Sequence, residues 1–119
     1  TYGHLVGDEV LKQVASILVS SVRTTDIVCR YGGEEFVILL IECGSVWAEK
    51  IAIRIREKVE DTIFKTESLE LKLTVSIGVE TYHKGMTVQE VIDHADKALY
   101  EAKRSGRNRV VVYAKISST

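Results

Sequence analysis

Two adjacent glycines followed by two adjacent glutamates lie at the centre of segment 30–36, whose sequence is R-Y-G-G-E-E-F. Strand-like apolar runs flank this segment on both sides. Gly32 and Gly33 predict a tight hairpin turn, because such turns need residues that tolerate positive φ. The glycines also let a large anionic ligand approach the main chain, and Glu34 and Glu35 offer carboxylates for a hard cation such as Mg²⁺. On its own the segment is more typical of a plain hairpin with solvated glutamates, so its meaning depends on the other motifs.

The remaining residues that could do chemistry each have a structural explanation as well. Arg23 and Asp26 form an R-x-x-D pattern, which alone indicates only a local surface ion pair. His4 lies in a glycine-containing segment that we interpret as a loop, and Asp8 is well placed as the N-cap of the helix that follows. Cations crowd the end of the last helix, where they compensate its dipole: Lys103, Arg104, Arg107 and Arg109.

Three amphipathic helical patterns must position these residues. The first follows Asp8, and the second covers 47–59. The third begins at a capping box of Thr87 and Glu90 and is stopped by Gly106 as a C-terminal cap. The solvated side of the second helix is predicted to consist of Lys50, Arg54, Arg56, Glu57 and Lys58.

The strand patterns complete the expected fold. Residues 69–80 alternate between apolar and polar side chains and predict one half-buried strand, in which Gly78 indicates a bulge or the close approach of another backbone. The last strand is expected at 110–113. This order of helix, hairpin, helix, strand, helix and strand predicts an α+β fold, a mixed β-sheet flanked by helices. A strand leading into the first helix would complete a β-α-β-β-α-β ferredoxin-like core, and we expect that first strand to be missing from residues 1–119.

Composition excludes several classes of protein. The 119 residues suffice for one domain, and the formal net charge of −1 provides no field that favours nucleic acid or an anionic membrane. No apolar run is long enough for a membrane segment, and no signal peptide is visible. Cys29 and Cys43 fit no metal spacing, so we interpret them as free thiols in a reducing compartment, in keeping with a cytoplasmic location.

The chain resembles the GGDEF domain, the catalytic domain of diguanylate cyclases, over essentially its whole length. The resemblance implies a nucleotide-cyclase-like core and rests on separated motifs in the family's order: Y-G-H with G-D-E-V-L at 2–11, R-x-x-D at 23–26, R-Y-G-G-E-E-F at 30–36, V-S-I-G-V at 75–79, and A-D-x-A-L-Y-x-A-K with G-R-N at 95–108. The hairpin has glutamate where aspartate is commoner in the family, and active members have either.

The resemblance implies a reaction in which two GTP molecules, one on each of two facing domains, condense to cyclic di-GMP and pyrophosphate. It implies Mg²⁺ or Mn²⁺ as the cofactor, Glu34 as a metal ligand and catalytic base, and Glu35 close to the metal. Lys103 and Arg107 would hold the β- and γ-phosphates, and their spacing of one helical turn leads us to expect that they point the same way. The full set of implied GTP-binding residues is His4, Asp8, Gly32, Gly33, Lys103 and Arg107.

Arg23 and Asp26 match the family's inhibitory product site, where an arginine fork and an aspartate suit the edges of guanine. Two alternatives to the cyclase are a non-catalytic receptor for cyclic di-GMP or GTP and a regulatory dimerisation module. The intact G-G-E-E-F argues against the receptor, and a dimerisation module would not need Asp8, Lys103 and Arg107 together.

In the family a strand and a short helix precede Thr1 and carry an aspartate, a lysine and an asparagine of the nucleotide site. We therefore expect residues 1–119 alone to be inactive. As a less favoured alternative, a strand from a neighbouring chain could take the place of the missing first strand. We also expect a sensor or regulatory domain upstream, which could anchor the full-length protein to a membrane.

Overall fold

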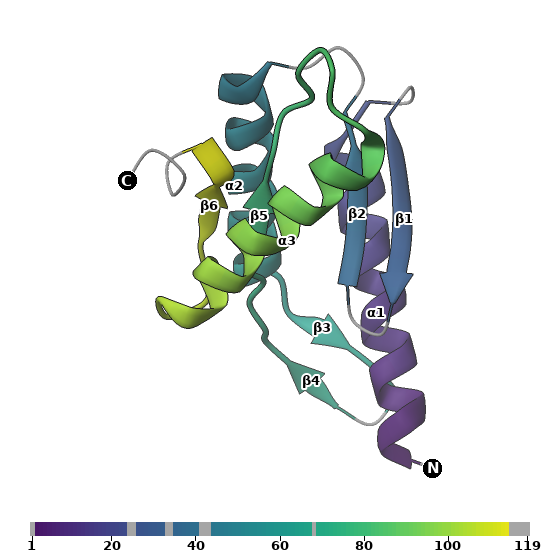
Figure 1. Cartoon of the computed structure of the whole chain (residues 1–119). Coiled ribbons are helices and arrows are strands. Elements are labelled where there is room, and N and C mark those ends of the chain that lie inside the picture. Colours follow the sequence, from purple (N-terminus) through teal and green to yellow (C-terminus); the bar gives the residue numbers. More distant parts are fainter. Residues whose placement is uncertain (1, 24–25, 33–34, 41–43, 68, 115–119) are drawn as a thin grey trace.

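The computed structural model describes residues 2–23, 26–32, 35–40, 44–67 and 69–114 (Figure 1). The elements in chain order are α1 (Tyr2–Ser21), β1 (Ile27–Gly32), β2 (Glu35–Leu39), α2 (Ser45–Asp61), β3 (Phe64–Lys65), β4 (Glu70–Leu71), β5 (Ile77–Val79), α3 (Val88–Arg104) and β6 (Val110–Val112).

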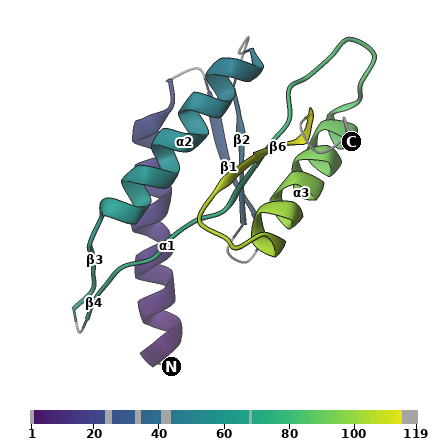
Figure 2. The ribbon, with the colours of Figure 1, turned by 90° about the vertical axis from the view of Figure 1, so that its left-hand side faces the viewer.

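The elements form three layers, with α1 and α2 on one face of the strands and α3 on the other (Figure 2). Strands β1 and β2 form an antiparallel hairpin, and β5 pairs with β6 in parallel. The short β3–β4 hairpin extends away from the other strands toward α1, where the Gln13 side chain donates to the backbone oxygen of Lys65 over 2.6 Å. The mixture of parallel and antiparallel pairs between helices confirms the expected α+β class.

The main core lies between α1, α2 and the strands. Its buried residues recur at helical spacing on both helices, because each helix turns one apolar face inward. Phe64, which follows α2, is fully buried with them. The cluster consists of Val10, Val14, Leu18, Ile55, Val59 and Phe64. A smaller cluster joins α2 to the parallel pair through Ala48, Ala52, Val79 and Val112.

Both predicted ends of α3 are confirmed. The Thr87 hydroxyl accepts from the amide of Glu90 at 3.1 Å, and the Glu90 carboxylate accepts from the amide of Thr87 at 3.0 Å, which is a complete capping box. At the other end Gly106 follows the C-cap Ser105 and has φ +129°, a conformation that glycine adopts without steric cost.

Helix α3 crosses β5 at Gly78, as the sequence predicted for a close approach of another backbone. A methyl group at this position would overlap the carbonyl oxygen of Ala95 and the amide nitrogen of Leu99. Ala98 and Ala102, farther along the same helix, have no solvent-exposed surface. Small side chains on both elements therefore let α3 lie directly on the strand.

Two expectations about local structure are wrong. The segment before Asp8 is not a loop: α1 begins at Tyr2, so His4 and Asp8 lie within the helix and Asp8 is not its N-cap. Glycine in a helix costs only about 1 kcal/mol relative to alanine, so Gly3 and Gly7 do not end one. The sequence also continues the apolar row of α1 backward at four-residue spacing to Val6.

The expected strand over 69–80 is divided into β4 and β5, with no strand pairing in 72–76. Its alternation nevertheless predicted the correct inward face, because Leu71, Leu73, Val75 and Ile77 pack against the main core. Ladder hydrogen bonds need a neighbouring strand, and among the described residues β5 has one only on the side of β6.

We expect Gly78→Ala to lower the free energy of unfolding by about 2 kcal/mol or more, because the added methyl group meets backbone atoms that cannot rotate away. Urea unfolding of the purified protein measures this. Gly7→Ala is the matched control: Gly7 is exposed in α1 with nothing within 4 Å of an added Cβ. That control should be stabilised by about 0.5–1 kcal/mol. Equal stability of the two variants would contradict the close contact at Gly78.

Candidate functional site

The predicted hairpin is present as the antiparallel pair of β1 and β2. Gly32 ends β1 and is paired with Glu35, the first residue of β2, and the register shifts between Arg30 and Gly32. Gly33 and Glu34 lie outside the described residues, and so does the side chain of Glu35. The roles proposed for Gly33, Glu34 and Glu35 therefore stay predictions. The described part of the chain contains no cluster of three or more side chains that could ligate a metal.

A large groove runs between β2 and β5, with α1 and α2 on one side and α3 on the other. Its volume is about 860 Å³. Most of the lining is apolar, including Ile38 of β2 and Val79 of β5. Within the described residues β2 pairs only with β1 and β5 only with β6, so the strand edges on either side of the groove have no partner strand there.

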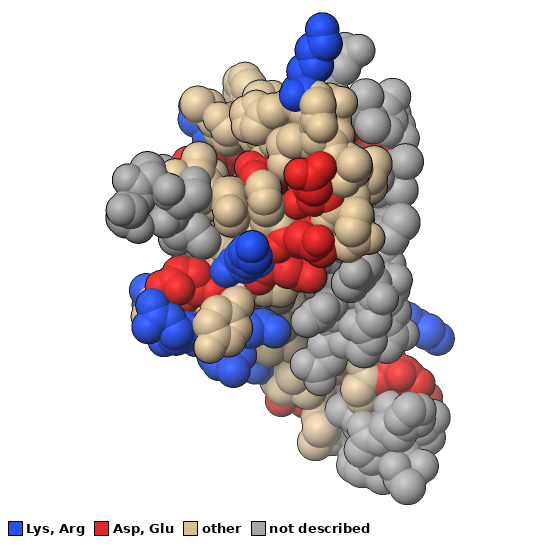
Figure 3. All heavy atoms as spheres, viewed as in Figure 1, with Lys and Arg blue, Asp and Glu red and all other residues tan. Residues whose placement is uncertain are grey.

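Lys103 and Arg107 both line this groove. We expected them to point the same way because they are spaced by one helical turn, and that reason is wrong. Helix α3 ends at Arg104, and Arg107 lies beyond it with φ +64°. It is the turn after α3 that brings Arg107 back to the same cavity as Lys103. Figure 3 shows Lys and Arg side chains gathered toward the C-terminal end of α3 and carboxylates nearer its middle.

Arg104, next to Lys103, is bound to Glu101. Its guanidinium donates to both carboxylate oxygens, at 3.2 and 2.6 Å. The hydrogen bond and the charge of Glu101 raise the pKa of Arg104 above its already high ordinary value. Of the four cations at the C-terminal end of α3, Lys103 and Arg107 line the groove, and Arg104 and Arg109 do not.

The two remaining nucleotide candidates lie on α1. Asp8 is half-buried, and its neighbour Gly7 lines the groove. His4 lies one helical turn before Asp8, and its side chain is outside the described residues. Asp8 itself is not among the residues that line the groove, so the contacts expected of Asp8 and of His4 both stay predictions.

Arg23 and Asp26 form the ion pair that their spacing suggested. The Arg23 guanidinium donates from Nε to Oδ2 at 3.1 Å and from its NH2 group to Oδ1 at 3.0 Å. The backbone amide of Arg23 also donates to Oδ2 at 2.9 Å. The Asp26 side chain has no exposed surface, whereas that of Arg23 is 52% exposed. Asp26 therefore holds Arg23 in one orientation, with half of its surface available to a ligand.

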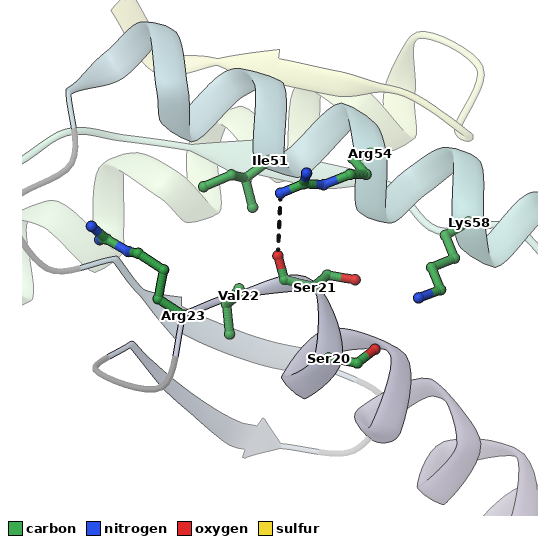
Figure 4. A pocket seen from close by; sticks show the side chains of 7 residues that line it. All are labelled: Ser20, Ser21, Val22, Arg23, Ile51, Arg54 and Lys58. Atoms are coloured by element: carbon green, nitrogen blue, oxygen red, sulfur yellow. Dashed lines mark hydrogen bonds between the residues drawn. The ribbon is translucent and has the colours of Figure 1, made fainter.

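Arg23 lines a second, smaller pocket of about 380 Å³, which lies between the end of α1 and α2 (Figure 4). Arg54 and Lys58 of α2 line the same pocket, and Arg54 donates to the backbone oxygen of Ser21 at 3.5 Å. We had interpreted both residues only as part of a solvated helix face. Their spacing of four residues places them on one side of α2, which is the signal that could have identified them.

Comparison with known proteins covers nearly all of this chain. Residues 1–109 match the family model GGDEF, described as "Diguanylate cyclase, GGDEF domain". Diguanylate cyclase A of Treponema denticola is 42% identical over 113 residues, which are 94% of this chain and 30% of that protein. The chain thus spans less than a third of the length of this relative.

Two solved structures are similar in fold and sequence. The GGDEF domain of DgcB from Caulobacter crescentus, in complex with c-di-GMP, has a TM-score of 0.88 and 33% identity, over 96% of this chain and 68% of that chain. The active GGEEF domain of a diguanylate cyclase from Vibrio cholerae has a TM-score of 0.77 and 33% identity, over 89% and 67%.

No helix in the described part of the chain is both long and apolar enough to cross a membrane. The hairpin that flanks the G-G-E-E-F sequence and the family-model match over 1–109 agree with each other. This chain belongs to the GGDEF family of diguanylate cyclase domains.

Proposed function

We propose that this domain, as part of a longer protein, condenses two GTP molecules into cyclic di-GMP and pyrophosphate. The observation that carries the proposal is the unaltered G-G-E-E-F sequence at the turn of an antiparallel hairpin. The similar domain from Vibrio cholerae is described as active and carries the same glutamate variant of the signature. An intact signature is the feature that a non-catalytic receptor or a dimerisation module does not need.

Each half-reaction joins a ribose 3′-oxygen to the α-phosphorus of the other GTP and breaks the bond from that phosphorus to pyrophosphate. Glu34 accepts the proton of the attacking hydroxyl, which makes the oxygen a better nucleophile. Gly32 and Gly33 let the nucleotide lie against the turn, because no side chain projects there. Since one domain binds one GTP, the reaction requires a second copy of the domain facing the first.

Glu34 and Glu35 are the residues that would hold the divalent cation. Two neighbouring carboxylates provide the hard oxygen donors that Mg²⁺ and Mn²⁺ prefer, so this donor set fits the cofactor. The cation neutralises charge on the triphosphate. Lys103 and Arg107 add positive charge for the β- and γ-phosphates from the groove. Asp8 accepts hydrogen bonds from the guanine edge, and His4 contacts the nucleotide.

The groove between β2 and β5 is the position for one further strand. Both flanking edges are open among the described residues, and a strand placed there would pair on both sides while burying apolar residues on both faces. We propose that residues upstream of Thr1 provide this strand, together with the aspartate that completes the metal site. A regulatory domain farther upstream would control how two copies meet.

Residues 1–119 alone should not produce cyclic di-GMP from GTP, whereas the protein extended upstream should do so with Mg²⁺ or Mn²⁺. The shorter chain lacks one side of the metal site and one strand of the sheet. Chromatographic detection of cyclic di-GMP at equal concentrations of the two proteins provides the comparison. Similar rates for both would show that the upstream strand is not needed.

Glu34→Gln in the extended protein should lower turnover by at least ~100-fold, in the range typical of losing a general base. The change keeps the shape of the side chain but removes a charge beside the metal. A circular dichroism melt should match that of the unaltered protein, since the residue lies at a turn. Near-normal turnover in a folded variant would make Glu34 an ordinary solvated glutamate.

We further propose that cyclic di-GMP inhibits the enzyme by binding at Arg23 and Asp26. The supporting geometry is the Arg23 guanidinium fixed by Asp26 and the three cations, Arg23, Arg54 and Lys58, that line one pocket. Such a pocket suits a ligand with two phosphates and guanine edges. Because β1 connects Asp26 to the catalytic hairpin, product bound here could hold two domains apart without touching either GTP site.

Arg23→Ala in the extended protein should weaken binding of cyclic di-GMP by about ten- to a hundredfold, the cost of a charged hydrogen-bonded contact. Product inhibition should be relieved while initial turnover is largely kept. Calorimetric titration and reaction progress curves measure the two effects. Lys50→Ala is the control, because Lys50 is an exposed cation of α2 outside the pocket lining. Unchanged product affinity would leave Arg23 and Asp26 an ordinary ion pair, and an equal loss of initial turnover would place Arg23 in the active site.

A further inference from the structure

The turn that carries Arg107 has an unusual backbone. Gly106, Arg107 and Asn108 have φ values of +129°, +64° and +47° in succession. Residues with a Cβ atom rarely adopt such angles, and two in a row need support from their surroundings. Part of the support is local: the amide of Arg107 donates to the carbonyl of Ala102 at 2.9 Å, and the Arg109 side chain donates to the carbonyl of Arg107 at 3.0 Å.

The rest of the support comes from distant segments and meets at Asn108. The Asn108 side-chain oxygen accepts from Arg56 at 3.1 Å, and its amide group donates to Glu60 at 2.5 Å. Both partners lie on α2, one helical turn apart. The backbone amide of Asn108 donates to the hydroxyl of Ser76 at 3.2 Å, just before β5.

The chemistry of the partners fixes the orientation of the Asn108 amide. An arginine can only donate and an ionised glutamate can only accept, so the oxygen must face Arg56 and the nitrogen must face Glu60. Arg56 also contacts Glu60 at 3.4 Å, which closes the group of three side chains. Arg56 is only 21% exposed, so its charge is partly shielded from water and its hydrogen bond is strengthened.

We propose that Asn108 is a positioning residue for Arg107, and that Arg56 and Glu60 thereby let α2 fix the geometry of triphosphate binding. The proposal rests on the proposed function, in which Arg107 holds phosphate. Arg107 directly precedes Asn108 in the chain and lines the groove, so the direction of its side chain follows from the backbone that Asn108 holds. A cation held in place before the ligand arrives loses less conformational freedom on binding, which strengthens the complex.

The simpler role for Asn108 is to tolerate positive φ, and Asn108→Gly separates the two roles. Glycine adopts φ +47° more easily than asparagine but makes no bond to α2. In the full-length protein, this variant should raise the KM for GTP about tenfold with kcat changed less than about threefold, as expected when binding rather than chemistry is affected. Its thermal unfolding midpoint should stay close to that of the unaltered protein.

A double variant shows whether the effect passes through Arg107. Arg107→Ala with Asn108→Gly should bind GTP no more weakly than Arg107→Ala alone, because a positioning residue has nothing left to position. Glu60→Ala should raise KM in the same direction as Asn108→Gly. Glu57→Ala is its matched control on the exposed side of α2 and should not change KM.

The outcomes separate this inference from the function on which it rests. If the unaltered full-length protein shows no GTP binding by calorimetry, the proposed function and this inference both fail. If it binds GTP and Asn108→Gly binds equally well, only the positioning role is overturned. Additive losses in the double variant would likewise overturn it, since they would show that Asn108 acts independently of Arg107.

Discussion

Helix α3 lies on β5 at a distance that only a glycine permits, and much of the candidate site depends on that contact. Gly78 meets the backbone of α3 at Ala95 and Leu99, while Ala98 and Ala102 are fully buried on the same helix. With this crossing fixed, the C-terminal end of α3 and the turn after it have one available position beside the strands. The amide of Ile77, next to Gly78, donates to the carbonyl of Arg109 at 2.9 Å and joins that turn to β5. The location of Lys103 and Arg107 thus follows from close packing several residues away.

Helix α2 contacts both the pocket beside Arg23 and the turn that carries Arg107, and it uses a different face for each. Arg54 and Lys58 line the pocket beside Arg23, whereas Arg56 and Glu60 hold Asn108 and, with it, the turn that carries Arg107. Two positions along a helix differ by about 200° in direction, so residues 54 and 56 must face different neighbours. The pocket beside Arg23 and the turn that carries Arg107 are therefore both positioned by α2. The inner face of α2 is anchored by Ile55 and Val59 in the main core.

Local patterns in the sequence predicted the elements that depend on near neighbours. The hairpin, the capping box of α3, the glycine after its end and the close approach at Gly78 were all predicted from single positions or short spacings. The wrong expectations include two local ones, the loop before Asp8 and the helical spacing of Lys103 and Arg107, and one that is decided over a longer distance. The division of 69–80 into two strands depends on which strand edges find partners, and the proximity of Lys103 to Arg107 depends on a turn rather than a helical repeat. The four-residue spacing of Arg54 and Lys58 shows that they share one side of α2, but not that this side faces Arg23. The G-R-N motif contains Asn108, but nothing in it shows that Asn108 binds α2.

The edges of β2 and β5 that flank the groove have no partner strand among the described residues, and this has a consequence for handling the molecule. Unpaired backbone groups beside an apolar groove form a template onto which another extended chain can add. For residues 1–119 on their own, two copies could serve each other as that chain, and the association would increase with protein concentration. The measured association would then reflect strand exchange between copies rather than the face-to-face pairing of the proposed reaction. A particle size measured on this segment by itself therefore says little about the catalytic assembly.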